Sequence, residues 1–217
     1  MRSMLVIGLG RFGSNLATRL AELGNEVMVV DRDETAVEKI APLVTRAQIG
    51  NCMDETILRT LGVRNFDVCF VCITDDFQAS LEITSLLKDL GAPCVVAKAD
   101  RSIHAKFLLK IGADEVIYPE RDMARRSAVR FSVPHAFDYF ELSPEYALFE
   151  IQVPEGWVGR TLQELDIRSR HSVNVIGVRE ETGRVTPITS AQRPFAPGEH
   201  LLICGGKADV LRLTNQK

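Results

Sequence analysis

Three glycines near the start of the chain, Gly8, Gly10 and Gly13, have the spacing of a phosphate-binding loop. They follow the apolar run Met4–Ile7, which favours a strand, and they open a helical pattern that begins at Phe12. In this setting the first glycine permits a tight turn and the second lets the backbone approach a phosphate. The third lets the helix pack closely on the strand, and the helix N-terminus adds N–H donors. The spacing therefore predicts that this loop binds the phosphates of a nucleotide.

Two charged positions indicate which nucleotide fits. Asp31 ends the next predicted strand, where a carboxylate can accept hydrogen bonds from both ribose hydroxyls. Its charge would repel a 2′-phosphate, which Arg32 offsets only in part, so NADP is disfavoured. Arg11 adds a positive charge inside the loop, which suits the terminal phosphate of ATP or ADP better than the two phosphates of NAD. A solvated arginine at a helix start is the alternative interpretation of Arg11.

Other polar residues follow the remaining predicted strands, and the carboxyl ends of such strands form the ligand site of a parallel α/β sheet. Asn51 and Thr74 are candidates to contact the base and ribose. Lys98 is a candidate to contact the phosphates or an acidic neighbour. Glu120 could ligate a cation, as any surface glutamate could. Each of these residues also has a simpler interpretation as a cap or turn residue.

The sequence lacks the groups that a dehydrogenase uses, which include a proton donor or acceptor beside the nicotinamide. The four histidines, at positions 104, 135, 171 and 200, lie in predicted helices, the linker or the second domain. His104 is expected to be a surface or capping residue. There is no Tyr-x-x-x-Lys pair and no Gly-Lys-Ser/Thr phosphate loop. These observations favour a protein that binds a nucleotide without reacting it.

The elements that must position these residues alternate between short apolar runs and helical patterns, which is typical of a parallel sheet with crossover helices. Four predicted helices are followed by a glycine, a common way to end a helix: Gly24, Gly62, Gly91 and Gly112. The predicted strands are Met4–Ile7, Glu26–Val30, Val44–Ile49, Val68–Ile73, Cys94–Lys98 and Glu115–Tyr118. The predicted helices are Phe12–Leu23, Glu34–Ala41, Glu55–Leu61, Gln78–Leu90 and Ile103–Ile111. The fold class is therefore α/β, a Rossmann-like parallel sheet with helices on both faces.

The pattern changes after a further helix predicted over residues 120–133, which Pro134 is expected to end. The later strands are predicted over Tyr146–Val153, Val173–Arg179, Val185–Ile188 and His200–Cys204, with short helices over Thr161–Leu165 and Ala208–Leu213. This is the pattern of a small α+β domain with an antiparallel sheet. We predict a nucleotide-binding domain over 1–136 that includes the crossover helix, a linker near Ala136–Ser143, and a small second domain over 137–217.

Composition and charge narrow the class of protein. Apolar residues make up 46% and charged residues 25%, as in an ordinary globular protein. The net charge of −3 provides no positive field that would favour nucleic acid. The longest apolar run, Val68–Ile73, is far too short to span a membrane, and the first strand leaves no room for a signal peptide. We therefore expect a cytoplasmic protein that does not insert into the membrane.

Two of the five cysteines, Cys69 and Cys72, form a Cys-x-x-Cys pattern inside a predicted buried strand. Residues three apart on a strand point to opposite faces, so these two sulfurs cannot close a disulfide or a metal site. We predict that both are plain core cysteines.

Six segments recur in this order in one protein family: Leu5–Gly13, Val29–Asp33, Gly50–Cys52, Leu61–Asp67, Ile111–Asp114 and Tyr118–Met123. Through them the chain resembles the cytosolic regulatory subunits of Trk/Ktr-type potassium uptake systems, which join an RCK (KTN) N-domain to an RCK C-domain. The resemblance covers essentially the whole chain. It is most specific in the Gly-Arg-Phe-Gly loop and in the later Pro-Glu-x-Asp-Met block.

The resemblance implies dimers that assemble into an octameric ring of N-domains below a membrane-embedded potassium channel subunit. In such rings ATP favours the open state and ADP the closed state, and some relatives bind NAD(H). Arg11 would reach the γ-phosphate of a nucleotide in the neighbouring subunit, and Asp31 would bind the ribose. Glu120 would help to hold a divalent or monovalent cation near the γ-phosphate, and Lys98 would lie at the edge of the nucleotide. The complete predicted nucleotide site is Gly8, Gly10, Arg11, Phe12, Gly13, Asp31, Arg32, Asn51, Cys52, Thr74, Lys98 and Glu120.

The resemblance also implies a possible ligand for the second domain. C-domains of Ktr-type relatives can bind cyclic di-AMP at their dimer interface, and two segments here align loosely with that site. Arg168 would contact phosphate, while Ile167, Val175 and Pro187 would pack against the bases. An ordinary dimer interface is the alternative.

The leading hypothesis is a non-enzymatic, nucleotide-sensing subunit that gates a membrane potassium transporter from the inner face of the cell membrane. Two alternatives stay open: an NAD(H)-dependent reductase or redox sensor, and a nucleotide-binding adaptor for another transporter such as a proton antiporter.

Overall fold

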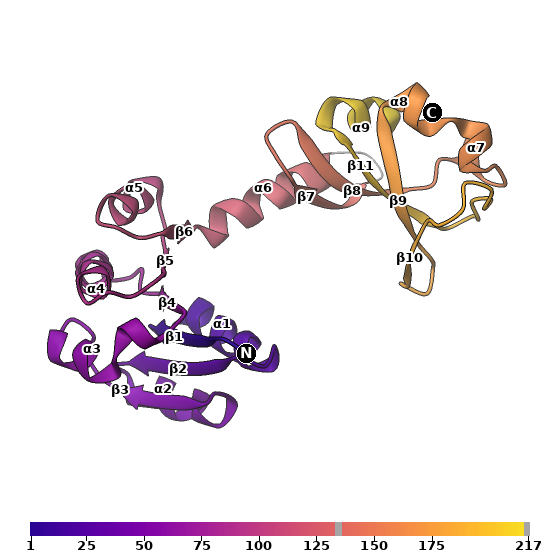
Figure 1. The fold of residues 1–217 in the computed structure, drawn as a ribbon. Helices are drawn as coiled ribbons and strands as arrows, with labels where there is room; N and C mark the ends of the chain where they lie inside the picture. The colour runs from indigo at the N-terminus through magenta and orange to yellow at the C-terminus, as the bar shows by residue number, and fades with distance from the viewer. Residues whose placement is uncertain (133–135, 215–217) are drawn as a thin grey trace. The chain divides into compact units, whose positions relative to one another are not determined.

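The computed structural model describes residues 1–132 and 136–214. The chain divides into two units, Met1–Glu120 and Arg121–Lys217. Each unit is built on its own sheet: β1 to β6 belong to the first, and β7 to β11 to the second (Figure 1).

The first unit is a six-stranded sheet in the order β3-β2-β1-β4-β5-β6, and all its strand pairs are parallel. This is the strand order of a Rossmann-type fold, so the predicted fold class is confirmed. The strands are β1 (Ser3–Ile7), β2 (Glu26–Asp31), β3 (Arg46–Ile49), β4 (Val68–Val71), β5 (Val95–Lys98) and β6 (Glu115–Ile117). The helices of this unit are α1 (Arg11–Glu22), α2 (Glu34–Ile40), α3 (Glu55–Leu61), α4 (Phe77–Asp89) and α5 (Ser102–Lys110), with short 3-10 helices η1 (Ala41–Leu43) and η2 (Val63–Asn65). Helix α6 (Pro119–Ser132) begins at the end of this unit and belongs mostly to the second.

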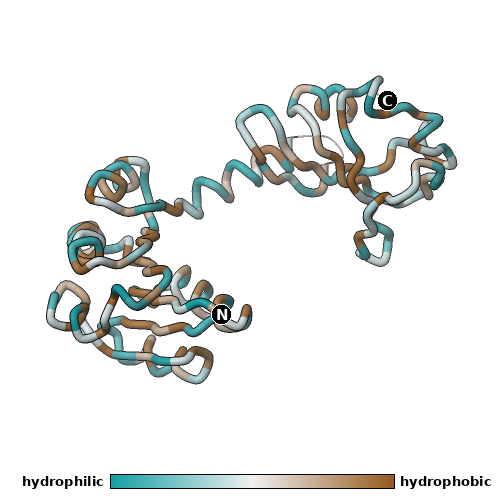
Figure 2. Tube along the Cα trace, viewed as in Figure 1, coloured by the Kyte–Doolittle hydropathy of each residue, from teal (hydrophilic) through white to brown (hydrophobic). Residues whose placement is uncertain are grey.

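Alternation along the strands divides their side chains between two hydrophobic cores. Helices α3, α4 and α5 contribute Leu58, Ile83 and Leu108 to one core. Helices α1 and α2 contribute Ala17 and Val37 to the core on the opposite face. In Figure 2, hydrophobic stretches run along β1 and β2, which lie between these helix layers.

The two cysteines of the Cys-x-x-Cys pattern lie in different cores, Cys69 in the first and Cys72 in the second. Burial raises the pKa of each thiol to about 12. The prediction that both are core cysteines on opposite faces is confirmed.

The second unit is a five-stranded antiparallel sheet in the order β10-β9-β11-β8-β7. Its elements are β7 (Ala136–Glu141), β8 (Tyr146–Gln152), η3 (Glu155–Trp157), α7 (Leu162–Leu165), α8 (Ile167–His171), β9 (Val173–Arg179), β10 (Val185–Pro187), β11 (His200–Gly206) and α9 (Lys207–Thr214). Phe149, Ile151 and Leu201 of the sheet and Val210 of α9 are among the buried residues of its core. Trp157 packs against this core, and its ring lies 5.5 Å from that of His171.

The prediction of a linker near Ala136–Ser143 is wrong, because most of that segment is strand β7. Tyr139 is buried, and its ring lies 5.1 Å from that of Phe149 on the neighbouring strand β8. A β-bulge between Ala136 and Asp138 interrupts the alternation that would have marked this strand in the sequence.

Helix α8 was also not predicted. Residues with positive φ flank it, Asp166 at 44° and Ser172 at 56°. Neither residue is the glycine that commonly marks a left-handed position, so these helix boundaries leave little sign in the sequence.

Helix α6 corresponds to the predicted crossover helix and is described as far as Ser132; the expected terminator Pro134 lies outside the described residues. No residue of α6 is buried, and Figure 2 shows the helix mostly in hydrophilic colours. Arg126 of α6 forms a bidentate pair with Asp138 of β7, with nitrogen–oxygen distances of 2.7 to 3.0 Å. Both residues belong to the second unit, so this pair fixes α6 to β7 within that unit.

Candidate functional site

A cavity of about 1020 Å³ opens at the carboxyl ends of the parallel strands in the first unit. Its walls come from the segments that follow β1, β2, β3, β4 and β5, and from the start of α6. This is the edge where parallel α/β sheets bind their ligands. All of the residues predicted for the nucleotide site line this cavity except Gly13, which packs against Gly8 and Cys72.

The glycine loop has the geometry that its sequence predicts. Gly8 has φ +94°, a conformation that other residues rarely adopt. A Cβ atom on Gly13 would lie 1.9 Å from the carbonyl oxygen of Gly8, so only glycine permits this approach of α1 to β1. A Cβ on Gly10 would meet nothing within 4 Å, which leaves open space next to the backbone at the start of α1. The loop therefore offers backbone amides to a ligand without steric obstruction.

Asp31 connects this loop to β2. Its Oδ2 atom accepts a hydrogen bond from the backbone amide of Leu9 at 2.5 Å, and its Oδ1 atom accepts one from the amide of Asp33 at 2.9 Å. Each carboxylate oxygen can accept a second hydrogen bond, so the side chain keeps capacity for the two hydroxyls of a ribose.

The residues that follow β3 and β4 also line the cavity. Asn51 is exposed, and its side-chain oxygen accepts a hydrogen bond from the amide of Met53 at 3.2 Å. Cys52 is buried, and burial together with the negative charge of Asp31 raises the pKa of its thiol to about 12. Thr74 is half-buried in the loop that precedes α4. These positions suit contact with a base and a sugar, and the thiol of Cys52 is neutral at ordinary pH.

Lys98 and Glu120 meet at the end of the cavity nearest α6. The Nζ atom of Lys98 lies 3.1 Å from Oε1 of Glu120 and 5.7 Å from the centre of the Phe12 ring. Lys98 is only 12% exposed, whereas Glu120 is 62% exposed. Hydrogen bonds from the backbone amide of Glu120 and from Lys98 lower the pKa of the Glu120 carboxyl.

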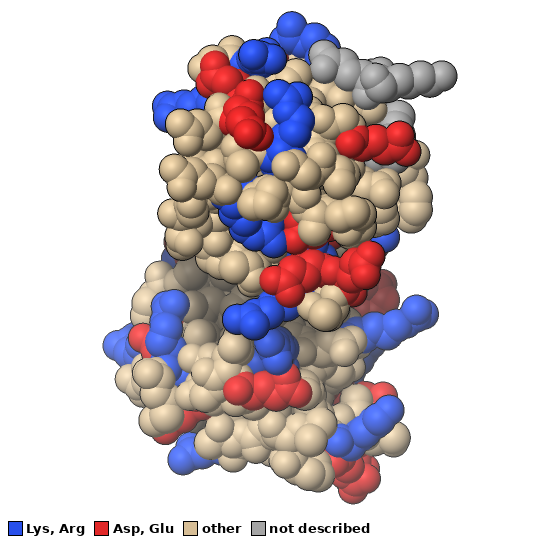
Figure 3. Space-filling view, turned by 90° about the vertical axis from the view of Figure 1, so that its right-hand side faces the viewer, with Lys and Arg blue, Asp and Glu red and all other residues tan. Residues whose placement is uncertain are grey.

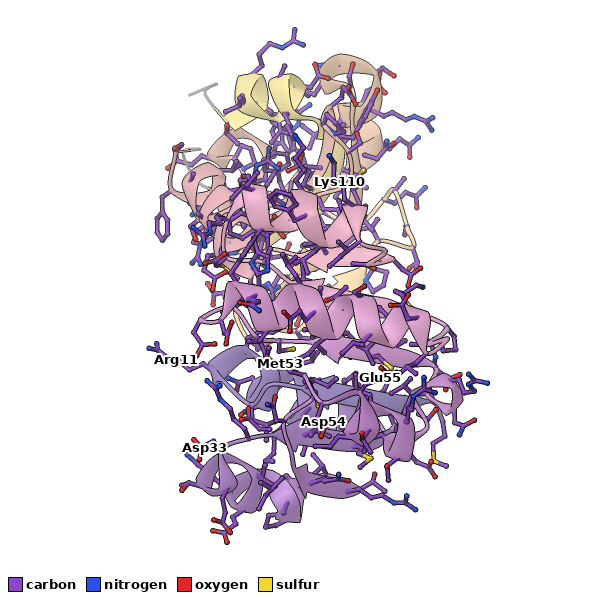
Figure 4. All side chains as sticks on the ribbon, turned by 90° about the vertical axis from the view of Figure 1, so that its left-hand side faces the viewer. Arg11, Asp33, Met53, Asp54, Glu55 and Lys110 are labelled. Carbon is purple, nitrogen blue, oxygen red and sulfur yellow. The ribbon has the colours of Figure 1, made fainter. Side chains whose placement is uncertain are left out.

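Charged side chains of both signs line the cavity, and carboxylates outnumber cations. The cations are Arg11, Arg32 and Lys98, and the carboxylates are Asp31, Asp33, Asp75, Asp76 and Glu120. Asp33 and Asp76 cap the N-termini of α2 and α4, so their charge is partly taken up by backbone donors. Across the described ranges, Arg11 forms no ion pair, and its side chain extends outward from the start of α1 (Figure 4).

Glu120 as a cation ligand stays a prediction. Over residues 1–132 and 136–214, no group of three or more His, Cys, Asp or Glu side chains could by itself hold a metal ion.

A smaller cavity of about 260 Å³ lies in the second unit. Three of the residues predicted to bind cyclic di-AMP line it, namely Ile167, Arg168 and Val175. Pro187 is not part of this lining; it lies on strand β10, opposite Gly177 of β9. The structure therefore brings together three of the four predicted residues within one protomer.

The expectation that His104 is a surface or capping residue is wrong, because its side chain is completely buried between α4 and α5. Its Nε2 atom lies 3.1 Å from the hydroxyl of the buried Ser80, and its Nδ1 atom lies 3.1 Å from Oδ1 of Asp100. Phe77 packs edge-on against the imidazole. Spacing in the sequence cannot reveal this contact, because Ser80 and His104 belong to different helices.

The surface charges are mixed rather than segregated. On the face shown in Figure 3, basic and acidic side chains are interspersed. None of the helices in the described part of the chain combines the length and apolar character needed to cross a membrane.

The fold and the cavity define a class of protein in which a Rossmann-type unit with a glycine-rich cavity is followed by a small α+β unit. The TrkA-N domain model matches residues 4–119, and the TrkA-C domain model matches residues 147–217. The chain belongs to the TrkA-N/TrkA-C family, as the resemblance of its motifs predicts.

Two relatives from Bacillus subtilis (strain 168) align along almost the whole chain. Ktr system potassium uptake protein C is 40% identical over 97% of this chain and 95% of its own length. Ktr system potassium uptake protein A is 34% identical over 99% of this chain and 96% of its own length. These relatives are named as potassium uptake proteins.

Solved structures share the fold at lower sequence identity. The GsuK RCK domain superposes with a TM-score of 0.69 at 18% identity, covering 99% of this chain and 47% of that one. The GsuK channel bound to NAD superposes with a TM-score of 0.68 at 18% identity, covering 96% of this chain and 38% of that one. The chain thus spans less than half the length of these GsuK chains.

Proposed function

We propose that this chain is the nucleotide-sensing regulatory subunit of a potassium uptake system and that it acts by binding rather than by catalysis. The observation that carries the proposal is the cavity at the strand ends, where Asp31 holds the glycine loop and Arg11 projects as an unpaired cation. The full-length similarity to Ktr system proteins supports the potassium uptake context.

An adenine nucleotide is the ligand that the cavity lining favours. The carboxylate of Asp31 suits a ribose with both hydroxyls free, and the amides at the start of α1 suit its phosphates. The unpaired charge of Arg11 gives a terminal phosphate a partner, which favours ATP or ADP. NAD(H) is kept among the ligands to be tested, since GsuK structures have been solved with NAD and with ADP.

Regulation by such a ligand requires two states of the assembly that bind it with different affinities. A ligand that binds both states equally does not change the equilibrium between them. We infer that the chain pairs into dimers, forms an octameric ring at the cytoplasmic side of a Trk/Ktr-type channel subunit, and uses the exposed helix α6 in pairing. The γ-phosphate, reached by Arg11 of a neighbouring subunit and balanced by a cation at Glu120, distinguishes ATP from ADP.

We further propose that the small cavity of the second unit contributes to a cyclic di-AMP site. The guanidinium of Arg168 and the apolar side chains of Ile167 and Val175 at one cavity support this assignment. Asp166, which lines the same cavity and has a φ of 44°, gives further support, because such backbone conformations are concentrated at ligand sites.

Titration calorimetry of the full chain with ATP, ADP and NADH, each with and without Mg²⁺, tests the proposal. Binding of ATP and ADP with unequal affinity and a cation effect on ATP are expected. Equal affinities without a cation effect would contradict gating by the γ-phosphate. Binding of NADH alone, followed by turnover of an added electron acceptor, would favour a reductase instead.

A further inference from the structure

We propose that the buried His104 is a positioning residue for the nucleotide cavity, although it is not among the residues that line it. Through Ser80 and Asp100 it holds together the segments that follow β4 and β5. These two strands are neighbours in the sheet, and their carboxyl ends both contribute to the cavity wall. The inference rests on the proposed nucleotide binding and adds a residue that fixes the spacing of two parts of that wall.

His104 joins two helices and a turn. Its Nε2 atom lies 3.1 Å from the hydroxyl of Ser80 in the first turn of α4, and its Nδ1 atom lies 3.1 Å from Oδ1 of Asp100, between β5 and α5. An ionised carboxylate only accepts hydrogen bonds, so Nδ1 carries the proton. In the neutral ring Nε2 then accepts from the hydroxyl of Ser80. Both ring nitrogens are used, which fixes the orientation of the imidazole.

Both ends of this hydrogen-bonded chain adjoin residues of the cavity lining. Ser80 follows Ala79, which lines the cavity. Asp100 is separated from Lys98, another lining residue, only by the fully buried Ala99. So short a stretch of backbone has little slack, so a shift of Ser80 or Asp100 moves the cavity wall beside it.

A second contact joins the same two segments. The ring of Phe77, the first residue of α4, lies edge-on to the imidazole of His104, with 5.0 Å between the ring centres. The guanidinium of Arg101 lies 5.5 Å from the centre of the Phe77 ring. Two consecutive residues of the turn before α5 thus contact the first turn of α4, Asp100 through His104 and Arg101 directly.

The polar groups lie at one end of the helix pair, in the first turns of α4 and α5, which follow the strand ends where the cavity opens. Farther along these helices the contact is apolar, and Leu87 and Leu108 are completely buried in the same core. An apolar residue in place of His104 would avoid the cost of burying an imidazole. Packing alone therefore does not call for this histidine, whereas a fixed distance between the two segments does.

Two substitutions of Asp100 isolate its contact with His104. Asp100 is 41% exposed, so both variants should fold. Asp100→Asn and Asp100→Ala remove the same charge, but only asparagine keeps an oxygen that accepts from Nδ1 of His104. Calorimetry of the full chain with ATP should show binding about fivefold weaker for Asp100→Ala than for Asp100→Asn.

A matched pair of substitutions within α5 separates positioning from stability. His104→Leu removes both hydrogen bonds and should weaken ATP binding about fivefold or more. Leu108→Ala leaves a cavity in the same core but keeps both bonds of His104, so it should lower the free energy of unfolding and leave the ATP affinity unchanged. Unchanged ATP affinity in folded His104→Leu would show that the histidine only stabilises the fold.

Hydrogen exchange followed by mass spectrometry gives a readout that a purely structural role would not move. ATP should slow exchange in the first turn of α5, although this helix, described over its whole length, contributes no residue to the cavity lining. The slowing should persist in Asp100→Asn and be lost in Asp100→Ala saturated with ATP, while the glycine loop stays protected in both.

The outcomes distinguish the two proposals. If the unmodified chain binds no nucleotide, the proposed function is wrong and the positioning role falls with it. If it binds ATP but Asp100→Asn and Asp100→Ala bind ATP equally, only the positioning role is wrong.

Discussion

The backbone amide of Leu9 donates a hydrogen bond to Oδ2 of Asp31, with 2.5 Å between the nitrogen and the oxygen. Leu9 lies between the first two glycines of the loop, so the acid that ends β2 also fixes the turn that follows β1. Asp31 therefore has a structural role in addition to the proposed contact with a ribose, and a substitution there affects both.

Asp31→Ala is expected to weaken nucleotide binding by more than about tenfold and to lower the free energy of unfolding by about 1–2 kcal/mol, because the amide of Leu9 loses its partner. Calorimetry and urea denaturation measure the two effects. Asp33→Ala is the matched control: it removes the N-cap of α2 at a cost of about 1 kcal/mol but leaves the amide of Leu9 bonded. Equal nucleotide affinity in the two variants would contradict the role given to Asp31.

Replacement by alanine should have very different effects on stability at two glycines of the same loop. Gly13→Ala places a methyl group 1.9 Å from the carbonyl of Gly8 and should destabilise the fold by about 3 kcal/mol or more. Gly10→Ala enters open space and should change stability by less than about 1 kcal/mol, while it weakens nucleotide binding. Thermal unfolding and calorimetry distinguish the two. A stable Gly13→Ala protein would show that the loop packs differently.

Replacement of the buried His104 should be costly although it lies outside the cavity lining. His104→Leu leaves the buried hydroxyl of Ser80 without its imidazole partner and should lower the free energy of unfolding by about 2–3 kcal/mol. In the double variant with Ser80→Ala, the loss should be smaller than the sum of the two single losses. Additive losses in urea denaturation would argue against a bond between these side chains.

Thiol reactivity should divide the five cysteines into two groups. Cys52, Cys69 and Cys72 are buried and have pKa values raised to about 12, so they should resist alkylation at pH 8 in the folded chain. Cys94 and Cys204 are partly exposed and should react first. Mass spectrometry of peptides after brief labelling gives the order. Early labelling of Cys69 or Cys72 would contradict their place in the cores.

The Arg126–Asp138 pair predicts how the second unit responds to acid. Hydrogen bonds from Arg126 hold the pKa of Asp138 below its ordinary value. A carboxyl whose pKa is lowered on folding stabilises the folded protein above its unfolded pKa of about 4. This added stability is lost as the pH falls through the pKa that the carboxyl has in the folded protein.

Both side chains of this pair are more than two-fifths exposed, at 43% and 44%, so solvent screening limits the effect to about 0.5–1 kcal/mol. Arg126→Met should therefore be less stable by that amount at pH 7, and the difference should shrink towards zero near pH 3. Urea unfolding followed by the fluorescence of Trp157, the single tryptophan of the chain, reports on this unit. A difference that grows in acid would contradict the sign.

Much of the first unit could be predicted because its local signals agree with its topology. The glycines that follow helices all have positive φ, and parallel strands bring residues as distant as Gly8 and Lys98 to one edge. The errors lie where packing between distant segments decides. His104 is buried by a helix it does not adjoin in sequence, β7 contains a bulge, and Pro187 lies on a strand that the small cavity does not reach.

The central place of β1 also bears on how the chain is made. β1 is synthesised before both of its neighbours: it pairs on one side with β2 and on the other with β4, whose residues Val68–Val71 leave the ribosome much later. Until then one edge of an apolar strand stays open, and open edges recruit strands from other chains. A nascent or truncated chain that stops between β2 and β4 is therefore an aggregation-prone intermediate, and the arrival of β4 sets the earliest moment at which the first unit can close.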